Sequence, residues 1–432
     1  MSDAAAEATD RYRTIAISGD HLLERWFYKE VLHSWLDTTS RFGLSHGAFS
    51  SDRIDDGSKL LLESVAAHIE DKKSWAGCRV YDIGCGVGIL GIAAAASLRA
   101  RTLGLEDRDS LSVALACLNA WKNELSTEVI PNPAPTGVRT FGPAELVLCN
   151  LPAKAGASVH RLMIDHAVHQ LPSDGLAGFV VVRTLADAVE ERIATLPVTF
   201  EKIDAPGHAV FLLRRSRPVA GEARDSDHDL VTVDSGELVD PLPSAYRGNS
   251  SRFRVGNTGY SVTTVEGLPE FDGPSHITRM LIKLALDYVT GQPVLAVDDG
   301  PGHLVTVVSK RSSVVCCASR NALAGYAHEQ FSPGTKRRGK TNLSSVLAER
   351  PAALAPHIPE RGIVILPIVP EPYTPVFDEL VGLFEQARDR NSQCIVAGNS
   401  STISRFEKLK LPLAIRRRTK SRGVRGLVFE PT

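Results

Sequence analysis

A chain of 432 residues is about three times as long as one ordinary domain, so we expect two domains of roughly 200 residues each. Hydrophobic residues make up 43% and charged residues 23%, a balance that excludes a disordered chain or a disulfide scaffold. The formal net charge of −1 hides an asymmetry: the segment from Tyr246 onward carries a net +9 and the first 245 residues a net −10. This division favours RNA as a partner of the second half, although the two halves could also attract each other.

The sequence shows neither a membrane-spanning segment nor a secretory signal. The longest apolar run, residues 89–97, falls short of the ~20 residues that cross a bilayer, and the acidic first ten residues lack the basic and apolar parts of a secretory signal. We therefore expect a cytoplasmic protein. The seven cysteines form no CxxC pair, which predicts reduced, buried thiols and no metal site.

The first half alternates short apolar runs with helical stretches. A helix is predicted over residues 59–69, with Asp56 and Ser58 as candidates for its N-cap. Such alternation is typical of a parallel sheet covered by helices, an α/β fold. The predicted runs that follow are residues 79–83, 89–98, 102–106, 111–122, 145–149, 159–170 and 178–182.

The first run ends in a glycine motif, Asp82-Ile83-Gly84-Cys85-Gly86-Val87-Gly88, which leads directly into the next helix. Glycines let the backbone turn tightly and approach a ligand without a side chain between them. The spacing differs from GxGxxG and from the P-loop, so it does not indicate phosphate binding. It resembles the first motif of class I S-adenosylmethionine (SAM) dependent methyltransferases.

This resemblance implies that SAM is the cofactor and that it contacts Asp82, Gly84, Cys85, Gly86 and Gly88. The next predicted strand ends at Glu106, which lies 24 residues after Asp82. In related nucleotide-binding folds an acid at such a position accepts hydrogen bonds from ribose hydroxyls. We therefore expect Glu106 to bind the ribose of SAM.

A second motif, Asn150-Leu151-Pro152-Ala153-Lys154, follows the predicted strand at 145–149. It resembles the Asn-Pro-Pro-aromatic motif of methyltransferases that act on amines. A conjugated amine needs two acceptors that hold its hydrogens and orient its nitrogen. We expect the side chain of Asn150 and the carbonyl of Leu151 to be these acceptors. Asn150 is also expected to border the cofactor. Ala153 replaces the aromatic residue that would stack on a flat base, so stacking must come from elsewhere; Phe42, Phe49 and Trp121 are candidates.

Upstream residues narrow the resemblance. Residues 42–50, Phe-Gly-Leu-Ser-His-Gly-Ala-Phe-Ser, and residues 55–62, Asp-Asp-Gly-Ser-Lys-Leu-Leu-Leu, resemble the methyltransferase small-domain group, which includes ribosomal RNA small-subunit guanine-N2 methyltransferases. Those proteins are tandem duplications with one degenerate copy. Here the first copy carries the motifs, whereas in that group the second does. Phe49 and Lys154 are expected to contact the substrate.

The second half repeats the first at a spacing of about 214 residues. The glycine motif is matched near Asp298, and Asp82 falls on Ala296. We therefore predict a catalytic domain at residues 1–217, a linker at 218–245 and a degenerate, basic, substrate-recognition domain at 246–432. Its basic clusters provide the remaining candidates for substrate contact, Arg337, Arg338 and Arg417.

The sequence as a whole predicts two tandem Rossmann-like domains and an N-methyltransferase that acts on an exocyclic amine of guanine in ribosomal RNA. Two alternatives stay open. One is a methyltransferase for a small molecule or a protein side chain, and the other is a non-catalytic RNA-binding scaffold. The oligomeric state is left undetermined.

Overall fold

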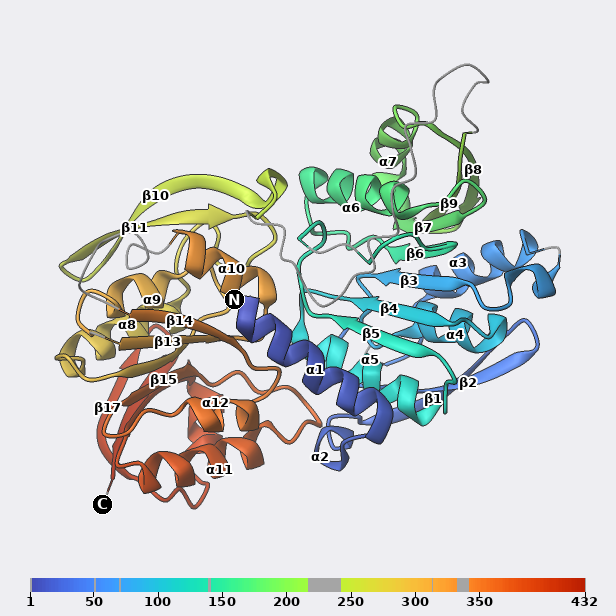
Figure 1. Ribbon diagram of the computed structural model, residues 1–432. Helices are drawn as coiled ribbons and strands as arrows, with labels where there is room; N and C mark the ends of the chain where they lie inside the picture. The colour runs from blue at the N-terminus through green and yellow to red at the C-terminus, as the bar shows by residue number, and fades with distance from the viewer. Residues whose placement is uncertain are drawn as a thin grey trace. The chain divides into compact units, whose positions relative to one another are not determined.

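The computed structural model describes residues 2–49, 52–69, 71–138, 141–216, 242–312, 314–331 and 342–431. The chain divides into two compact units, Ala6–Ala245 and Tyr246–Thr432 (Figure 1). Most of the predicted linker, together with Arg337 and Arg338, lies outside the described residues. Among the helices of the described segments, none has the length and apolarity needed to cross a bilayer.

The elements up to residue 215 form one α/β unit. Its strands are β1 (Lys29–Trp35), β2 (Thr38–Leu44), β3 (Arg79–Ile83), β4 (Thr102–Glu106), β5 (Glu128–Asn132), β6 (Leu146–Asn150), β7 (Leu176–Val182), β8 (Val198–Ala205) and β9 (His208–Arg215). Its helices are α1 (Ser2–Ser18), α2 (His21–Glu24), α3 (Asp56–Ala67), α4 (Ile89–Leu98), α5 (Ser110–Lys122), α6 (Ala157–Gln170) and α7 (Ala186–Ile193), with 3-10 turns at Lys72–Trp75 and Arg183–Leu185.

Seven of these strands form one sheet in the order β5-β4-β3-β6-β7-β9-β8. Strands β3 to β7 run parallel, and β8 and β9 add an antiparallel edge. Successive side chains of β3 point to opposite faces: Tyr81 contacts His166 of α6, whereas Asp82 contacts Gly91 of α4. The carboxyl ends of β3, β4 and β6 therefore meet at one edge, between helices on both faces.

The predicted bounds of the helix at residues 59–69 need correction. Helix α3 begins at Asp56 and ends at Ala67, earlier than the predicted 59–69, and its N-cap is Asp55. The Asp55 side chain accepts a hydrogen bond from the Ser58 amide at 3.0 Å, which is the usual geometry of an N-cap. Asp56 and Ser58, the two predicted candidates for the cap, instead lie in the first helical turn.

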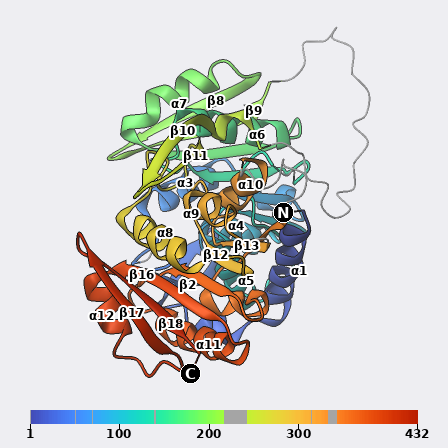
Figure 2. The ribbon, with the colours of Figure 1, turned by 90° about the vertical axis from the view of Figure 1, so that its left-hand side faces the viewer.

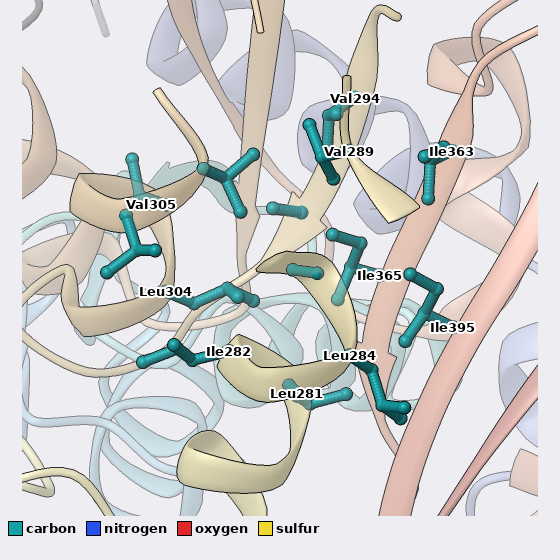
Figure 3. Packing of buried hydrophobic residues seen from close by; sticks show 14 of the residues in the cluster. Leu281, Ile282, Leu284, Val289, Val294, Leu304, Val305, Ile363, Ile365 and Ile395 are labelled. Carbon is teal, nitrogen blue, oxygen red and sulfur yellow. The ribbon is translucent and has the colours of Figure 1, made fainter. Parts of the chain in front are cut away.

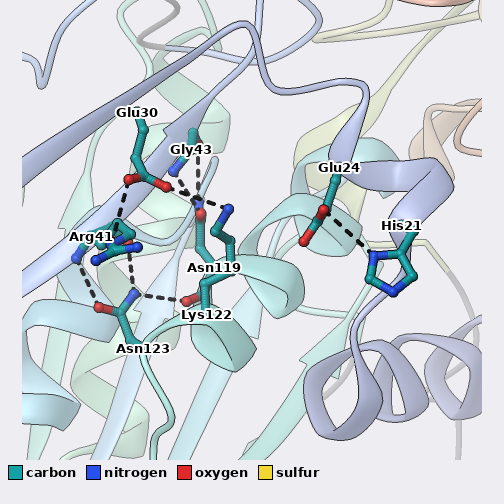
Figure 4. Close-up of polar contacts among 8 residues, drawn as sticks. All are labelled: His21, Glu24, Glu30, Arg41, Gly43, Asn119, Lys122 and Asn123. Atoms are coloured by element: carbon teal, nitrogen blue, oxygen red, sulfur yellow. Dashed lines mark hydrogen bonds and ion pairs between the residues drawn. The ribbon is translucent and has the colours of Figure 1, made fainter.

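Two asparagines of α5 hold the β1–β2 hairpin (Figure 4). Asn123 bonds to both backbone groups of Arg41, at 2.8 and 2.7 Å. Asn119 does the same at Gly43, at 2.8 and 3.1 Å, and its amide also donates to the Val87 carbonyl at 2.9 Å. The side chains thus imitate a paired strand along β2, and Asn119 ties the hairpin to the glycine motif.

The second unit repeats this architecture. Its strands are β10 (Arg247–Val255), β11 (Thr258–Val265), β12 (Val294–Val297), β13 (Val314–Ser319), β14 (Asn342–Leu347), β15 (Ile363–Pro367), β16 (Gln393–Asn399), β17 (Ala414–Ser421) and β18 (Val424–Glu430). Its helices are α8 (His276–Tyr288), α9 (His303–Val308), α10 (Ala322–Phe331), α11 (Val376–Asp389) and α12 (Ser400–Phe406), with 3-10 turns at Ser244–Tyr246 and Pro351–His357.

The second sheet has the order β14-β13-β12-β15-β16-β18-β17, which matches the first sheet position by position. In both units a two-stranded hairpin precedes the sheet, and in both a glycine with positive φ, Gly88 or Gly302, caps the helix after the central strand. These glycines are 214 residues apart, as the repeat requires. The predicted fold class of two tandem α/β domains is confirmed.

Side chains of α8 fill the core of the second unit (Figure 3). Leu281 and Leu284 pack toward Ile365 of β15 and Ile395 of β16, and all four are at most 2% exposed. Helix α8 alternates these apolar positions with polar ones at helical spacing, so one face is buried and the other is not. At the far edge of this sheet, β17 pairs with β18 (Figure 2).

Candidate cofactor and substrate site

The glycine motif forms an open turn between β3 and α4. Gly84, Gly86 and Gly88 all have positive φ, at +71°, +53° and +87°. Residues other than glycine rarely adopt this backbone conformation, because they carry a Cβ atom. Among the described residues, a Cβ atom added at Gly86 would meet nothing within 4 Å, and one at Gly84 would meet only the Cε atom of Met163, at 3.7 Å. Space therefore lies directly against the backbone, as a ligand-binding turn requires.

Asp82 lies beneath this turn and is fully buried. Its Oδ2 accepts a hydrogen bond from the Gly91 amide at 2.8 Å, while Oδ1 is buried and has no partner among the described residues. Burial, the largest effect, raises the pKa of Asp82 to about 7. An unpartnered buried oxygen beside an open turn is a feature that a polar ligand would satisfy.

Glu106, at the end of β4, is buried, and its carboxylate is surrounded by hydrogen-bond donors from the same domain. It accepts hydrogen bonds from the Tyr81 hydroxyl, from Asn132 at 2.7 Å and from Thr136 at 2.7 Å. Burial raises its pKa to about 7, although these three hydrogen bonds lower it. A carboxylate has about four acceptor positions, so Glu106 retains capacity for one further donor.

The next residue, Asp107, was not among the site residues that the sequence predicted. Its Oδ2 accepts from the Gly86 amide at 3.0 Å and its Oδ1 from the Asp109 amide at 2.8 Å, so its carboxylate lies against the glycine turn. Burial, followed by the charge of Asp109, raises the pKa of Asp107 to about 6. Asp82, Glu106 and Asp107 together form an acidic group that favours a positively charged ligand.

Asn150 ends β6, the strand next to β3 in the sheet. Its amide nitrogen Nδ2 donates to Asp55 Oδ2 at 2.8 Å and lies 3.1 Å from Ser58 Oγ. The Leu151 amide donates to the Val180 carbonyl at 2.9 Å, which continues the pairing with β7. Within the described segments, neither Asn150 Oδ1 nor the Leu151 carbonyl accepts a hydrogen bond.

The loop after Asn150 is fixed by α6. The Pro152 carbonyl accepts from the Ala155 amide at 3.0 Å and lies 2.8 Å from Nε2 of His160. Lys154 is exposed and forms no ion pair with any described residue. Cys85 and Cys149 are buried, and burial raises the pKa of both thiols well above its ordinary value, so neither is a nucleophile.

The three aromatic candidates differ in exposure. Phe42 is fully buried in β2, and the Trp121 ring packs against Gly19, where an added Cβ would lie 3.0 Å from it. Phe49, which lies in the loop before α3, is 66% exposed. Phe49 is therefore the one of the three whose ring is available to stack on a ligand.

The second copy fills the corresponding place with its own side chains. Asp298 accepts from the amides of Gly300 at 3.0 Å, Leu304 at 3.0 Å and Val305 at 3.3 Å. Its carboxylate thus occupies the start of α9, where the first copy has an open turn. The sheet register places Ala318 opposite Val297, as Glu106 lies opposite Ile83, so an acid is replaced there by a methyl group.

Arg417, a predicted substrate contact on β17, is paired with Asp287 at 2.8 Å. Its neighbours Arg416 and Arg418 pair with Glu430 and Glu407. Other cations of this region, Lys408, Lys410, Lys420 and Arg422, are exposed and form no ion pair with the described residues. Across the described segments, no group of three or more His, Cys, Asp or Glu could hold a metal ion.

Residues 40–203 match the family described as Methyltransferase small domain. The chain is 26% identical over 141 residues to the uncharacterized protein YbxB of Bacillus subtilis, covering 32% of this chain and 67% of that protein. It is 28% identical over 127 residues to ribosomal RNA small subunit methyltransferase C of Hamiltonella defensa, covering 29% of this chain and 35% of that protein. It is also 33% identical over 135 residues to ribosomal protein L11 methyltransferase of Synechococcus, covering 28% and 42%.

The chain thus spans less than half the length of these two methyltransferases. Among solved structures, the Thermus thermophilus 16S rRNA N2 G1207 methyltransferase, in complex with AdoMet and guanosine, is similar with a TM-score of 0.61 and 16% identity. That likeness covers 95% of this chain and 100% of the other. At this identity it is a likeness of fold, and it extends over both domains.

Proposed function

We propose that the protein is a SAM-dependent N-methyltransferase that modifies a guanine exocyclic amine in ribosomal RNA. The premise is the match of residues 40–203, in its first domain, to the methyltransferase small-domain family, which the motifs of this domain predicted. The methyltransferase class follows from the family. The cofactor, the amine and the RNA are the proposal. A ribosomal substrate would make the cytoplasm its place of action.

The pair of unused acceptors at Asn150 and Leu151 carries the proposal. An exocyclic amine conjugated to a ring has two hydrogens and a delocalised lone pair. The Asn150 Oδ1 and the Leu151 carbonyl come from adjacent residues and accept nothing within the described segments. By taking the two hydrogens, they would orient the nitrogen for attack, which lowers the barrier by positioning.

The residues around the glycine turn fit SAM. The open backbone at Gly84 and Gly86 leaves room for the cofactor, and the unpartnered Oδ1 of Asp82 offers an acceptor. Asp82, Glu106 and Asp107 would hold a ligand that carries positive charge, because a cation bound beside buried carboxyl groups favours their ionised form and is stabilised by it. SAM, when bound, supplies a methyl group that its sulfonium charge already activates. Glu106 stays the predicted ribose contact, and Asp107 is a second candidate for it.

The RNA substrate is supported by two observations. Relatives of the first domain include ribosomal RNA small subunit methyltransferases. The second half carries a net +9, and several of its exposed lysines and arginines are left without ion pairs in the described segments. Cations of this kind bind phosphates without base specificity, while the Asn150 site would select the amine.

A second candidate is methylation of a protein side chain or small molecule. It is favoured by Ala153, which removes the aromatic stacking partner of a flat base, and by the L11 methyltransferase among the relatives. In that case the basic second half would not be needed for RNA. A non-catalytic RNA-binding scaffold is the third reading.

Methyl transfer from labelled SAM separates these candidates. The wild type and Asn150→Ala are each incubated with naked ribosomal RNA, assembled ribosomal subunits, ribosomal protein and a small-molecule extract. We expect label in RNA, at N2 of guanine after nucleoside analysis, and a loss of about 100-fold or more in Asn150→Ala. Label only in protein or small molecules would support the second candidate, and SAM binding without any transfer would support the scaffold.

A further inference from the structure

The orientation of the Asn150 amide decides whether it can hold an amine. An asparagine side chain has a donor end and an acceptor end of nearly equal shape, so it can turn over with little cost in packing. Turned one way it accepts a hydrogen from the substrate, and turned the other way it presents its own hydrogens to it. The protein therefore needs a device that fixes one orientation.

Asp55 is suited to this task. Its Oδ2 lies 2.8 Å from Asn150 Nδ2, and a carboxylate can only accept hydrogen bonds. The nitrogen of Asn150 must therefore face Asp55, and Oδ1 faces away. Ser58 Oγ, 3.1 Å from the same nitrogen, provides a second acceptor.

We propose that Asp55 is a positioning residue that locks the Asn150 amide with its oxygen toward the substrate amine, and that Ser58 supports it as a second acceptor for the same nitrogen. This inference rests on the proposed function, because it concerns the same site. It also gives a physical reason for the Asp-x-Gly-Ser order of this segment.

The start of α3 holds both residues rigidly. Asp55 caps the helix by accepting from the Ser58 amide at 3.0 Å, so one carboxylate oxygen joins the helix to Asn150. Gly57 lies between them, and a Cβ atom added there would be 2.9 Å from Asp55 Oδ2 and 3.1 Å from the ring of His208. A larger residue at position 57 would push the carboxylate away from Asn150.

Asp55→Ala, Asp55→Ser and Ser58→Ala test the lock. A serine at position 55 can still cap α3, but its hydroxyl can donate as well as accept, so it no longer forces one orientation of Asn150. We expect Asp55→Ala to lower both the thermal midpoint and kcat. Asp55→Ser should restore the midpoint but leave kcat about 10- to 100-fold down, with SAM affinity by calorimetry changed less than about twofold. Ser58→Ala should lower kcat by a smaller factor.

Asp56→Ala is the matched control, because Asp56 is the neighbouring carboxylate, is exposed and, among the described residues, forms ion pairs only with Arg53 and Lys59. It should leave kcat unchanged. If Asp55→Ser restores kcat together with the midpoint, Asp55 acts only as a helix cap and the proposal is overturned.

A readout independent of activity separates this proposal from the proposed function. The side-chain amide signals of Asn150 in nitrogen-15 spectra are assigned as the pair missing in Asn150→Ala. We expect them to shift in Asp55→Ser and to stay in place in Asp56→Ala. If the wild type transfers no methyl group to any acceptor, the proposed function fails, and unchanged amide signals in Asp55→Ser would overturn the lock itself.

Discussion

Asp82 makes the stability of the ligand-free protein depend on pH. Its pKa is raised by burial to about 7, whereas the unfolded chain has the ordinary value of about 3.9. Between these values the folded state keeps a proton that the unfolded state has lost. The contribution of Asp82 to stability is therefore fully present below about pH 4 and is lost as the pH rises through about 7.

We expect Asp82→Asn to increase the free energy of unfolding at pH 8 by on the order of 1–3 kcal/mol, because it removes a buried charge and keeps an acceptor for the Gly91 amide. At pH 5 the gain should be clearly smaller. Urea unfolding at both pH values measures it, with the exposed Asp56→Asn as control. A gain of equal size at both values would show that Asp82 stays ionised in the fold. The same variant should bind SAM more weakly, since it lacks the charge that favours a cation.

The difference between local and distant signals decides which site residues the sequence could reveal. Asp82, Gly84 and Gly86 belong to one continuous motif, so their grouping was predictable. Asp55 and Asn150 lie far apart in the chain and meet only because α3 starts beside the end of β6. Their contact has no signature in the sequence.

The hairpin formed by β1 and β2 depends on two asparagines of one helix, which allows a matched comparison. Asn119 is fully buried and makes three hydrogen bonds to the backbone of Gly43 and Val87. Asn123 makes the same pair of bonds to Arg41 at an exposed position. Buried backbone groups that lose their partners are costly, whereas exposed ones bind water instead.

We expect Asn119→Ala to lower the free energy of unfolding by about 2–4 kcal/mol and Asn123→Ala by less than about 1 kcal/mol. Chemical denaturation of both variants measures the difference. Equal losses would mean that water does not replace the bonds at Arg41. Because Asn119 also holds Val87 of the glycine motif, its variant should weaken SAM binding as well.

Elements of the sheet were more predictable than the hairpin. The structure places β3, α4 and β4 at Arg79–Ile83, Ile89–Leu98 and Thr102–Glu106, as the apolar runs bounded by glycines and charges predicted. The hairpin was missed, because β1 exposes most of its side chains and shows no apolar run. Its second strand, β2, is held by Asn119 and Asn123, which are distant in the sequence, so the sequence pattern alone could not reveal the hairpin.

At the scale of the whole molecule, the two units have the same topology but differ at the glycine turn after the central strand. The first has an open glycine turn with acids around it, and the second has Asp298 bonded to the amides at the same place. The opposite net charges of the two halves follow this division. A domain whose glycine turn is filled keeps its fold, and its surface is then free to change toward another task, such as the proposed contact with RNA.

The salt dependence of RNA binding tests whether the second domain contacts RNA. Each phosphate contact contributes about 0.7 to 0.9 to the slope of log affinity against log salt concentration. Lys420, near the end of β17, and Arg422, in the turn before β18, are exposed and have no ion pair within the described segments, so they are free to contact phosphates. We expect the double variant Lys420→Gln and Arg422→Gln to reduce the slope by up to about 1.5 and to weaken binding to all RNA sequences alike.

Arg418→Gln is the matched control, since Arg418 already forms an ion pair with Glu407 and its substitution should change the slope little. If neither variant alters the slope, the charges of this edge strand serve instead to prevent pairing with other sheets, which is a common use of charge at such edges.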